Sequence, residues 1–366
     1  MQGNPQPGDE VDVVTAEGKP IARGLYNPGS AIRVRLYRWD DGPLDEAFWS
    51  SRLAAAVRLR HEVLGLGGAG SAYRLVFSEG DGLSGLTVDR YDRWLVVQFT
   101  SLALYSHRKL LLDRLAVQVP AEGILARTER GIAPKEGLRP GEETIVGSIP
   151  QGPVEIVDHG LRYRVDLRSG QKTGFYLDHR DNRRVVAGSC QGRRVLDLFC
   201  FTGAFSLTAL RHGGATEAIG IDSSAAAIAR AREHAALNGL DRAQFETGDV
   251  LEALEQLRKG GQHFDVVICD PPKFARQAKD LERALKGYIR LNRAAVEVLA
   301  PDGLLVTCSC SGQVDRAMFA DLLGQVAEQA GRPIQILDQR GQAPDHPVSA
   351  SCLETEYLKC FICRVE

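Results

Sequence analysis

The sequence predicts an α/β protein in which a mostly parallel sheet, covered by helices on both faces, follows two smaller units. Beyond about residue 170, short and nearly continuous apolar runs alternate with segments of helical spacing. That rhythm is typical of parallel strands buried on both faces. The earlier residues show strands without regular alternation, and 366 residues suffice for about two or three domains.

The composition excludes several classes of protein. Apolar residues make up 44% and charged residues 25%, an ordinary globular mixture that excludes disordered and fibrous architectures. The first ten residues do not resemble a signal peptide, and no run of about twenty apolar residues suggests a membrane span. Eight cysteines, several of them within apolar segments, indicate reduced thiols. We therefore expect a cytoplasmic protein.

Residues 1–42 are expected to form a small β domain. Apolar runs such as Val11–Val14 and Ile32–Leu36 are short and broken by glycine. From Lys19 to Arg38 the chain carries five basic residues and no acid, which form either a solvated strand face or a face that contacts phosphates. They are Lys19, Arg23, Arg33, Arg35 and Arg38.

Residues 43–168 are expected to form a central α+β domain. Leu44–Leu64 has helical spacing and ends at the glycine-rich stretch 65–70, which we interpret as a boundary. Strands and one helix (Tyr105–Val119) follow, a pattern that does not reveal a function. The strands are predicted at Tyr73–Phe77, Leu86–Asp89, Trp94–Phe99, Gly123–Arg127 and Val154–Val165.

Residues 169–366 are expected to form the large sheet. Its parallel strands are predicted at Arg194–Phe199, Ala218–Asp222, Ala243–Thr247, Phe264–Asp270 and Leu304–Ser309. Two last segments, Pro333–Asp338 and Tyr357–Val365, are predicted to pair antiparallel at one edge, which completes a sheet of seven strands.

Four acids stand at or just past successive strand ends, namely Asp197, Asp222, Asp249 and Asp270. Each alone could be a helix N-cap or a loop residue. Together they predict a crevice outside the carboxyl ends of the strands, where Asp222 is suited to ribose hydroxyls. The turn after the first strand has one glycine, Gly203, where a dinucleotide fingerprint needs three, so NAD and FAD are disfavoured.

With these motifs the chain resembles class I S-adenosylmethionine-dependent methyltransferases, which have a Rossmann-like fold. The resemblance implies that S-adenosylmethionine is the cofactor and that S-adenosylhomocysteine is its product. It implies that Asp197 and the turn through Phe199, Thr202 and Gly203 hold the methionine part. Asp222 would then hold the ribose and Asp249 the adenine amine.

The fourth and fifth strands predict a catalytic pair. The Asp270-Pro271-Pro272 turn is stiff, and it could hold Asp270 against a planar base that bears an amine, or merely close a loop. Cys310 lies at the end of the next strand, and strand alternation puts Cys308 on its side but deeper. A thiolate that adds to C6 of cytosine makes C5 nucleophilic enough to take a methyl group. Methylation of an exocyclic amine remains an alternative, with Cys310 as strand packing.

The other cysteines are expected to be buried small side chains, as is common for this residue. They are Cys190, Cys200, Cys269, Cys352, Cys360 and Cys363. A zinc site of Cys308, Cys310, Cys360 and Cys363 is disfavoured, because two cysteines separated by one residue on a strand chelate poorly. We expect no metal.

Further segments match a narrower group, namely 171–180, Asp270–Phe274, Ser309–Gly312, Asp345–Pro347 and Glu356–Lys359. With them, nearly the whole chain resembles the cytosine-5 methyltransferases of large-subunit ribosomal RNA that carry an N-terminal PUA domain. The resemblance implies that the segment before the sheet closes over the cofactor. The alternative is that this segment is the N-terminus of a helix that packs on the sheet. Its residues there are Phe175, Tyr176, Asp178 and Arg180.

The chain also departs from the pattern. Many RNA cytosine-5 methyltransferases carry a second cysteine after the Pro-Pro turn, and this chain has Lys273 there. The base that removes the C5 proton is therefore unassigned, and His179 stays open as a proton shuttle. The PUA-like unit lacks an opening aromatic strand, so we expect it to be truncated or its first residue to be an artificial start.

With a net charge of −2, affinity for RNA must come from local clusters. One is the Lys19–Arg38 stretch and the other spans 162–184, and either could be a solvated face. We expect 23S ribosomal RNA or an assembly intermediate as partner and no membrane, and a homodimer is left open. A non-catalytic assembly factor is the alternative of another class. The expected substrate-binding residues are Arg33, Arg35, Lys172, Pro271, Pro272, Lys273 and Phe274.

Overall fold

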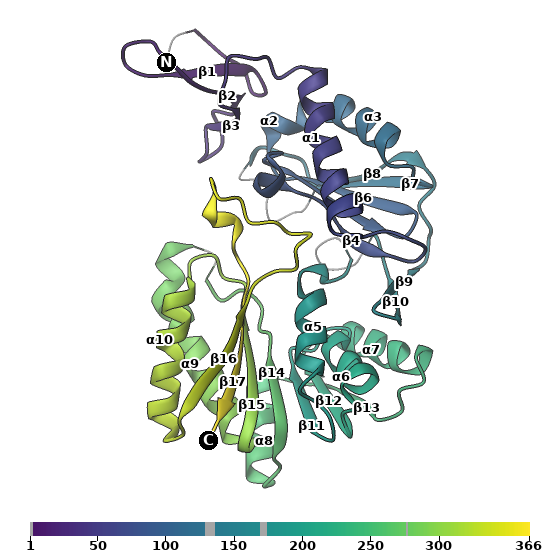
Figure 1. Ribbon diagram of the computed structural model, residues 1–366, viewed down its shortest axis with the longest axis vertical. Coiled ribbons are helices and arrows are strands. Elements are labelled where there is room, and N and C mark those ends of the chain that lie inside the picture. Colours follow the sequence, from purple (N-terminus) through teal and green to yellow (C-terminus); the bar gives the residue numbers. More distant parts are fainter. Residues whose placement is uncertain (1–2, 129–135, 169–173, 276) are drawn as a thin grey trace. The chain divides into compact units, whose positions relative to one another are not determined.

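A computed structural model describes residues 3–128, 136–168, 174–275 and 277–366. The chain divides into two compact units, both discontinuous in sequence. The first unit comprises Met1–Asp158, Arg164–Leu177 and Pro344–Thr355. The second comprises His159–Tyr163, Asp178–Ala343 and Glu356–Glu366. Figure 1 shows the elements of both units in the order of the sequence.

The first unit begins with a three-stranded antiparallel sheet, which confirms the small β unit expected near the N-terminus. Its strands pair in the order β1 (Glu10–Val14), β2 (Pro20–Tyr26) and β3 (Val34–Arg38). Tyr37 of β3 is buried and meets Trp49 edge to face at 5.0 Å. This small sheet therefore shares its apolar core with the helix that follows it.

A five-stranded sheet forms the rest of the first unit, in the order β4-β5-β6-β7-β8. The strands are β4 (Ala72–Phe77), β5 (Leu86–Tyr91), β6 (Trp94–Phe99), β7 (Gly123–Thr128) and β8 (Gly141–Gly147). The helices are α1 (Glu46–Arg58), α2 (Leu102–Tyr105) and α3 (Arg108–Gln118). A hairpin of β9 (Val154–Asp158) and β10 (Leu161–Val165) follows in sequence. The expected mixture of helices and strands is thus confirmed, whereas β8 was not expected.

The second unit contains the predicted seven-stranded sheet, in the order β13-β12-β11-β14-β15-β17-β16. Neighbours from β13 to β15 run parallel, and β17 pairs antiparallel with both β15 and β16. The strands are β11 (Arg194–Leu198), β12 (Glu217–Asp222), β13 (Ala243–Thr247), β14 (Phe264–Cys269), β15 (Leu299–Ser309), β16 (Ile334–Arg340) and β17 (Lys359–Val365). The Rossmann-like fold class is confirmed.

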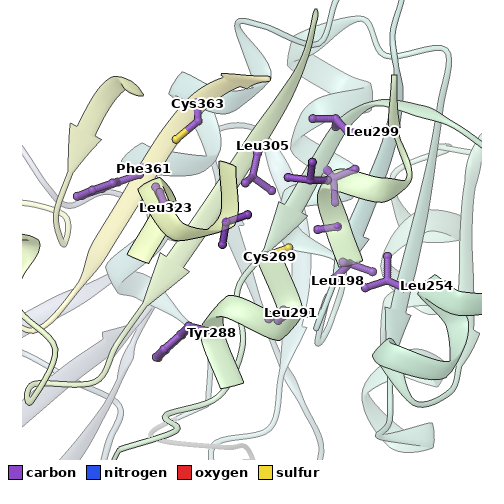
Figure 2. Close-up of a cluster of buried hydrophobic side chains, with 14 of the residues drawn as sticks. Leu198, Leu254, Cys269, Tyr288, Leu291, Leu299, Leu305, Leu323, Phe361 and Cys363 are labelled. Atoms are coloured by element: carbon purple, nitrogen blue, oxygen red, sulfur yellow. The ribbon is translucent and has the colours of Figure 1, made fainter. Parts of the chain in front are cut away.

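Helices cover both faces of this sheet (Figure 1). They are α5 (Arg180–Ala187), α6 (Ala204–Gly213), α7 (Ala225–Leu237), α8 (Val250–Lys259), α9 (Leu281–Glu297) and α10 (Arg316–Ala330). Strand alternation divides the apolar side chains between two cores. Leu198, Cys269 and Leu305 pack with α8, α9 and α10, as Figure 2 shows. Val266, Val306 and Cys308 pack on the opposite face with α5 and α6.

The strand order brings several loops to one edge of the sheet. Parallel strands place their carboxyl ends together, so the residues after β11, β12, β14 and β15 share that edge. Because β17 is antiparallel, its first residue lies there as well, and Lys359 pairs with Ser309 at the end of β15. Within the described ranges, no helix combines the length and apolarity needed to cross a membrane.

Candidate active site

The turn between β11 and α6 has an unusual backbone. Phe199 and Phe201 have φ of 60° and 48°, and Gly203 has φ of 80°. A Cβ atom at Gly203 would lie 2.6 Å from Cζ of Phe245 on β13. Both the left-handed conformation and this close contact therefore require glycine. The sequence placed Gly203 in the turn expected to hold the cofactor, but it gave no sign of the contact with the Phe245 ring.

Asp197 lies beneath this turn, at the end of β11. Its side chain is buried, and Oδ2 accepts hydrogen bonds from the backbone nitrogen of Ser206 at 3.1 Å and from its hydroxyl at 2.7 Å. These bonds tie the first turn of α6 to the strand. Burial raises the pKa of Asp197 to about 7, more than the two bonds lower it.

Asp222 ends β12 and supports the same turn. Its Oδ2 accepts from the backbone nitrogen of Phe201 at 3.0 Å, and Oδ1 accepts from that of Ser224 at 2.8 Å. Asp249 is exposed and caps α8, where Oδ1 accepts from the backbone nitrogens of the second and third helix residues. Within the fold Asp249 is therefore a helix N-cap, which was one of the alternatives for the acids at strand ends.

The turn contains a buried hydroxyl that a polar ligand could pair with. In the described part of the chain, Thr202 Oγ1 is buried and has no hydrogen-bond partner. An unpaired buried hydroxyl costs about 1–3 kcal/mol unless a ligand or water pairs it. Thr202 and the acids Asp197 and Asp222 supply the donors and acceptors that an amino acid and a ribose need. These residues therefore fit S-adenosylmethionine.

Asp270 follows β14 and faces a buried histidine. Its Oδ1 lies 3.4 Å from Nε2 of His179, while Nδ1 of His179 lies 3.2 Å from the amide nitrogen of Asn182. Burial lowers the pKa of His179, but the adjacent Asp270 carboxylate outweighs burial and brings it to about 9. The side chain of Asp270 keeps 24% of its surface exposed, so it can still meet a ligand.

Two buried thiols stand next to this histidine. Cys308 and Cys360 are cross-strand partners, and their sulfur atoms and a ring nitrogen of His179 lie within 4.8 Å of one another. Both ring nitrogens already have partners in Asn182 and Asp270, so coordination would cost those contacts, and we assign no metal to the cluster. Cys363 belongs to the opposite core, which separates it from the other cysteines of the disfavoured zinc site.

Cys310 is the residue after β15 and is half-buried. A hydroxyl network holds the backbone on both sides of it. Ser309 Oγ donates to the Tyr288 hydroxyl at 2.9 Å, and that hydroxyl lies 3.1 Å from Ser311 Oγ. Burial raises the pKa of Tyr288 to about 12, and the charges of Cys310 and Asp270 add to the shift. Cys310 is therefore held between two serines that bond to the same tyrosine.

The residues after Asp270 differ in environment. Pro271 is buried, whereas Pro272 and Lys273 are exposed. Phe274 packs on Tyr288 with 4.7 Å between ring centroids. The stiff turn is thus anchored at one end in the core of the sheet, and it presents Pro272 and Lys273 to solvent.

The segment before the sheet divides between the units. Phe175 and Tyr176 belong to the first unit, where the backbone nitrogen of Phe175 donates to the Tyr91 hydroxyl at 3.1 Å. Asp178 and Arg180 belong to the second unit, where Asp178 Oδ2 accepts from the Tyr357 hydroxyl at 2.6 Å. Lys172 lies outside the described residues.

The basic residues of the first unit are less available than the sequence suggested. Arg35 is 12% exposed and pairs with Glu79 at 3.3 Å and Glu136 at 3.2 Å. Arg23 and Arg38 also pair with acids, whereas Arg33 is exposed. The phosphate-facing interpretation therefore depends more on Arg33 than on Arg35.

Comparison with known proteins agrees with this geometry. A family model described as S-adenosylmethionine-dependent methyltransferase matches residues 111–354, and a PUA-like domain model matches residues 1–39. Ribosomal RNA large subunit methyltransferase I of Erwinia tasmaniensis is 40% identical over 100% of this chain and 92% of its own length. The chain belongs to this family of S-adenosylmethionine-dependent methyltransferases.

Other members and neighbours agree. The enzyme of the same name from Aeromonas hydrophila is 41% identical over 100% of this chain and 92% of its own length. Among solved structures, SMU.776 complexed with SAH has a TM-score of 0.86 at 22% identity, over 98% of this chain and 92% of that one. At that identity the likeness shows the fold alone. For this methyltransferase, S-adenosylmethionine is the cofactor.

Sequence reasoning missed several residues that surround Cys310. It assigned no role to Tyr288, Ser311 or Lys359, although all three are buried around Cys310. Tyr288 had no visible signal, since an aromatic residue within a helix is usually core. Lys359 had one, because a lysine that opens an apolar strand must bury its charge or meet a partner.

Proposed function

We propose that this methyltransferase transfers a methyl group to C5 of a specific cytosine in 23S ribosomal RNA, through a covalent adduct between Cys310 and C6 of the base. The observation that carries the proposal is the position of Cys310. It is a half-buried thiol at the end of β15, next to the β14 end that bears Asp270. The names of the relatives support ribosomal RNA as substrate.

S-adenosylmethionine supplies an electrophilic methyl group on a sulfonium. In this proposal Asp197 and Thr202 hold its methionine part, Asp222 its ribose and Asp249 its adenine amine. Phe199, Gly203 and Asp270 complete the pocket wall. The residues before the sheet would contribute further contacts, namely Phe175, Tyr176, Asp178 and Arg180.

The chain's own groups prepare the base. The Cys310 thiolate adds to C6, and the electron pair of the C5–C6 bond becomes available for the methyl group. Asp270 binds the amine edge of the cytosine, where charge develops during the attack. The contact between His179 and Asp270 holds this carboxylate in place before the base arrives.

The RNA side of the site is proposed from the exposed turn and the basic residues. Pro271, Pro272, Lys273 and Phe274 would line the entry for the base. Arg33 and Lys172 would contact phosphates, and Arg35 would do so only by giving up its ion pairs with Glu79 and Glu136. A paired cytosine must be flipped out at a cost of a few kcal/mol. An accessible loop or an assembly intermediate is therefore the expected substrate.

Nucleoside mass spectrometry tests the proposal. Unmethylated 23S ribosomal RNA is incubated with S-adenosylmethionine and the wild-type protein, Cys310→Ala or Cys308→Ala. We expect 5-methylcytidine from the wild type and Cys308→Ala, and none from Cys310→Ala, which should still bind S-adenosylmethionine by calorimetry. An N-methylated nucleoside as the product, or 5-methylcytidine from Cys310→Ala, would contradict the proposal.

A further inference from the structure

Lys359 is a buried lysine at the catalytic edge of the sheet. It is the first residue of β17, it pairs with Ser309 at the end of β15, and only 2% of its surface is exposed. Strand β17 flanks β15 on the side away from β14 and β11. Lys359 and the cofactor residues therefore stand on opposite sides of the β15 end that carries Cys310.

The hydrogen bonds of Lys359 match those of a neutral amine. Its Nζ donates to the carbonyl oxygen of Ser311 at 2.8 Å and to that of Tyr357 at 2.9 Å. A neutral amine has two hydrogens and one lone pair, so these bonds use both hydrogens and leave the lone pair for a proton. Among the residues that the structure describes, no carboxylate lies within ion-pair distance of Nζ.

The charges around Lys359 favour a group that titrates near neutral pH. The pKa of Lys359 is lowered to about 8, chiefly by burial; the charges of Cys310 and Glu356 oppose this shift, and the positive charges of Arg316 and Lys273 add to it. Glu356 is itself paired with Arg316 at 2.6 Å. The Tyr288 hydroxyl lies within hydrogen-bond distance of Ser311 Oγ, and Ser311 is also the residue whose carbonyl accepts from Lys359. A lysine in this setting is suited to general-base work.

We propose that Lys359 is the catalytic base that removes the C5 proton after methyl transfer, an inference that rests on the proposed function above. The C5–H bond breaks and its proton goes to Nζ, while its electron pair forms the C5–C6 double bond. The C6–S bond breaks in the same step, with its pair on the Cys310 sulfur, which then takes the proton from Nζ. The net proton of the reaction is the one that the thiol lost before its attack.

The geometry of the addition supports this role. The sulfur of Cys310 occupies one face of the base, so the methyl group arrives on the other face, toward the cofactor. The C5 proton is then left on the face of the sulfur, where a base must stand beside Cys310. Lys359 flanks the end of β15 on the side away from the cofactor residues, which makes it the candidate for that position. The position after the Pro-Pro turn holds Lys273 in place of a second cysteine.

The experiment separates formation of the adduct from its breakdown. Lys359→Gln keeps two amide hydrogens for the carbonyls of Ser311 and Tyr357 but lacks a basic lone pair. Lys286→Gln, at a lysine 73% exposed on α9, is the control. Single-turnover reactions on unmethylated 23S ribosomal RNA follow two readouts, the protein–RNA complex that survives denaturation and the free 5-methylcytidine. Calorimetry with S-adenosylmethionine confirms that each variant is folded.

For Lys359→Gln we expect the complex to accumulate at least tenfold over wild type and 5-methylcytidine to appear about 10²–10⁴-fold more slowly. The release rate of the wild type should rise with pH through about 8, and that of the variant should be flat. A variant that releases product at the wild-type rate, or that forms no complex, would overturn the inference. If wild-type protein itself forms no 5-methylcytidine, the proposed function fails instead.

Discussion

The carboxyl group of Asp197 is enclosed in the core, yet the proposed cofactor site needs its charge. Burial disfavours the charged form, so the pKa lies near 7, while Ser206 supplies two hydrogen bonds that ease ionisation. Because the folded pKa exceeds the unfolded value, the free energy of unfolding falls as the pH rises from about 4 to about 7. A bound cationic ligand would stabilise the ionised Asp197 and so offset the free-energy cost of burying its charge.

The affinity for S-adenosylmethionine should therefore depend on pH. Binding of the cationic amino acid part draws the proton off Asp197, so the Kd should fall as the pH rises from about 5.5 to about 7.5 and then level off. Calorimetry in two buffers of different ionisation heat measures the released proton. Asp197→Asn should lose the pH dependence, and a wild-type Kd that is flat over this range would contradict the assignment.

A second prediction concerns Asp222. Removing a carboxylate that accepts from ribose hydroxyls costs about 1.5–3 kcal/mol, so Asp222→Ala should weaken S-adenosylmethionine binding roughly 10- to 150-fold. The variant also loses the bonds to Phe201 and Ser224, so its thermal unfolding must be measured beside the calorimetry. An unchanged Kd would show that the ribose lies elsewhere.

At the scale of elements, the turn between β11 and α6 is the most constrained segment of the site. Gly203→Ala should cost about 2–5 kcal/mol, because a left-handed alanine costs about 1–2 kcal/mol and the contact with Phe245 adds about 1–3 kcal/mol. Gly239 has φ of 62° and open space around it, so Gly239→Ala should lose only the about 1–2 kcal/mol of the left-handed backbone. Equal losses in denaturant titration would contradict this explanation.

The strands of the large sheet were predictable because they are buried on both faces. The strand at Ala243–Thr247 matches its prediction residue for residue, and β11, β12 and β14 differ by one residue at an end. The early start of β15 was not predicted, because its first residues, Leu299–Gly303, include Pro301 and Asp302, which favour turns. Strand β8 was missed, since its exposed residues carry no apolar alternation.

At the scale of the whole molecule, the sequence could not show which segments return to an earlier unit. The segment Pro344–Thr355 joins the first unit, where Asp345 is buried and accepts from the backbone nitrogen of Arg74 at 2.9 Å. Within the site, the acids at the strand ends could be predicted from the sequence, because the topology of a parallel sheet alone brings them together. The surroundings of Cys310, with Lys359 and Tyr288, depend on contacts between distant residues that no local pattern encodes.

The distribution of charge leads to a prediction for RNA binding. With a net charge of −2, phosphate contacts must come from exposed cations such as Arg33. Arg33→Gln should weaken binding of 23S ribosomal RNA fragments and reduce the slope of log K against log salt by about 1, with S-adenosylmethionine binding unchanged. Arg258→Gln, at an arginine paired with Glu255, is the control. An unchanged slope for Arg33→Gln would remove this residue from the RNA surface.

The covalent chemistry at Cys310 is the central claim, and a trap tests it most directly. In RNA with 5-fluorocytidine at the target, the C5 substituent cannot leave as a proton, so the adduct should persist. We predict a denaturation-resistant complex whose mass includes one added methyl group and whose RNA maps to the peptide that contains Cys310. A wild-type protein that yields no complex, or one cross-linked through another residue, would contradict the account.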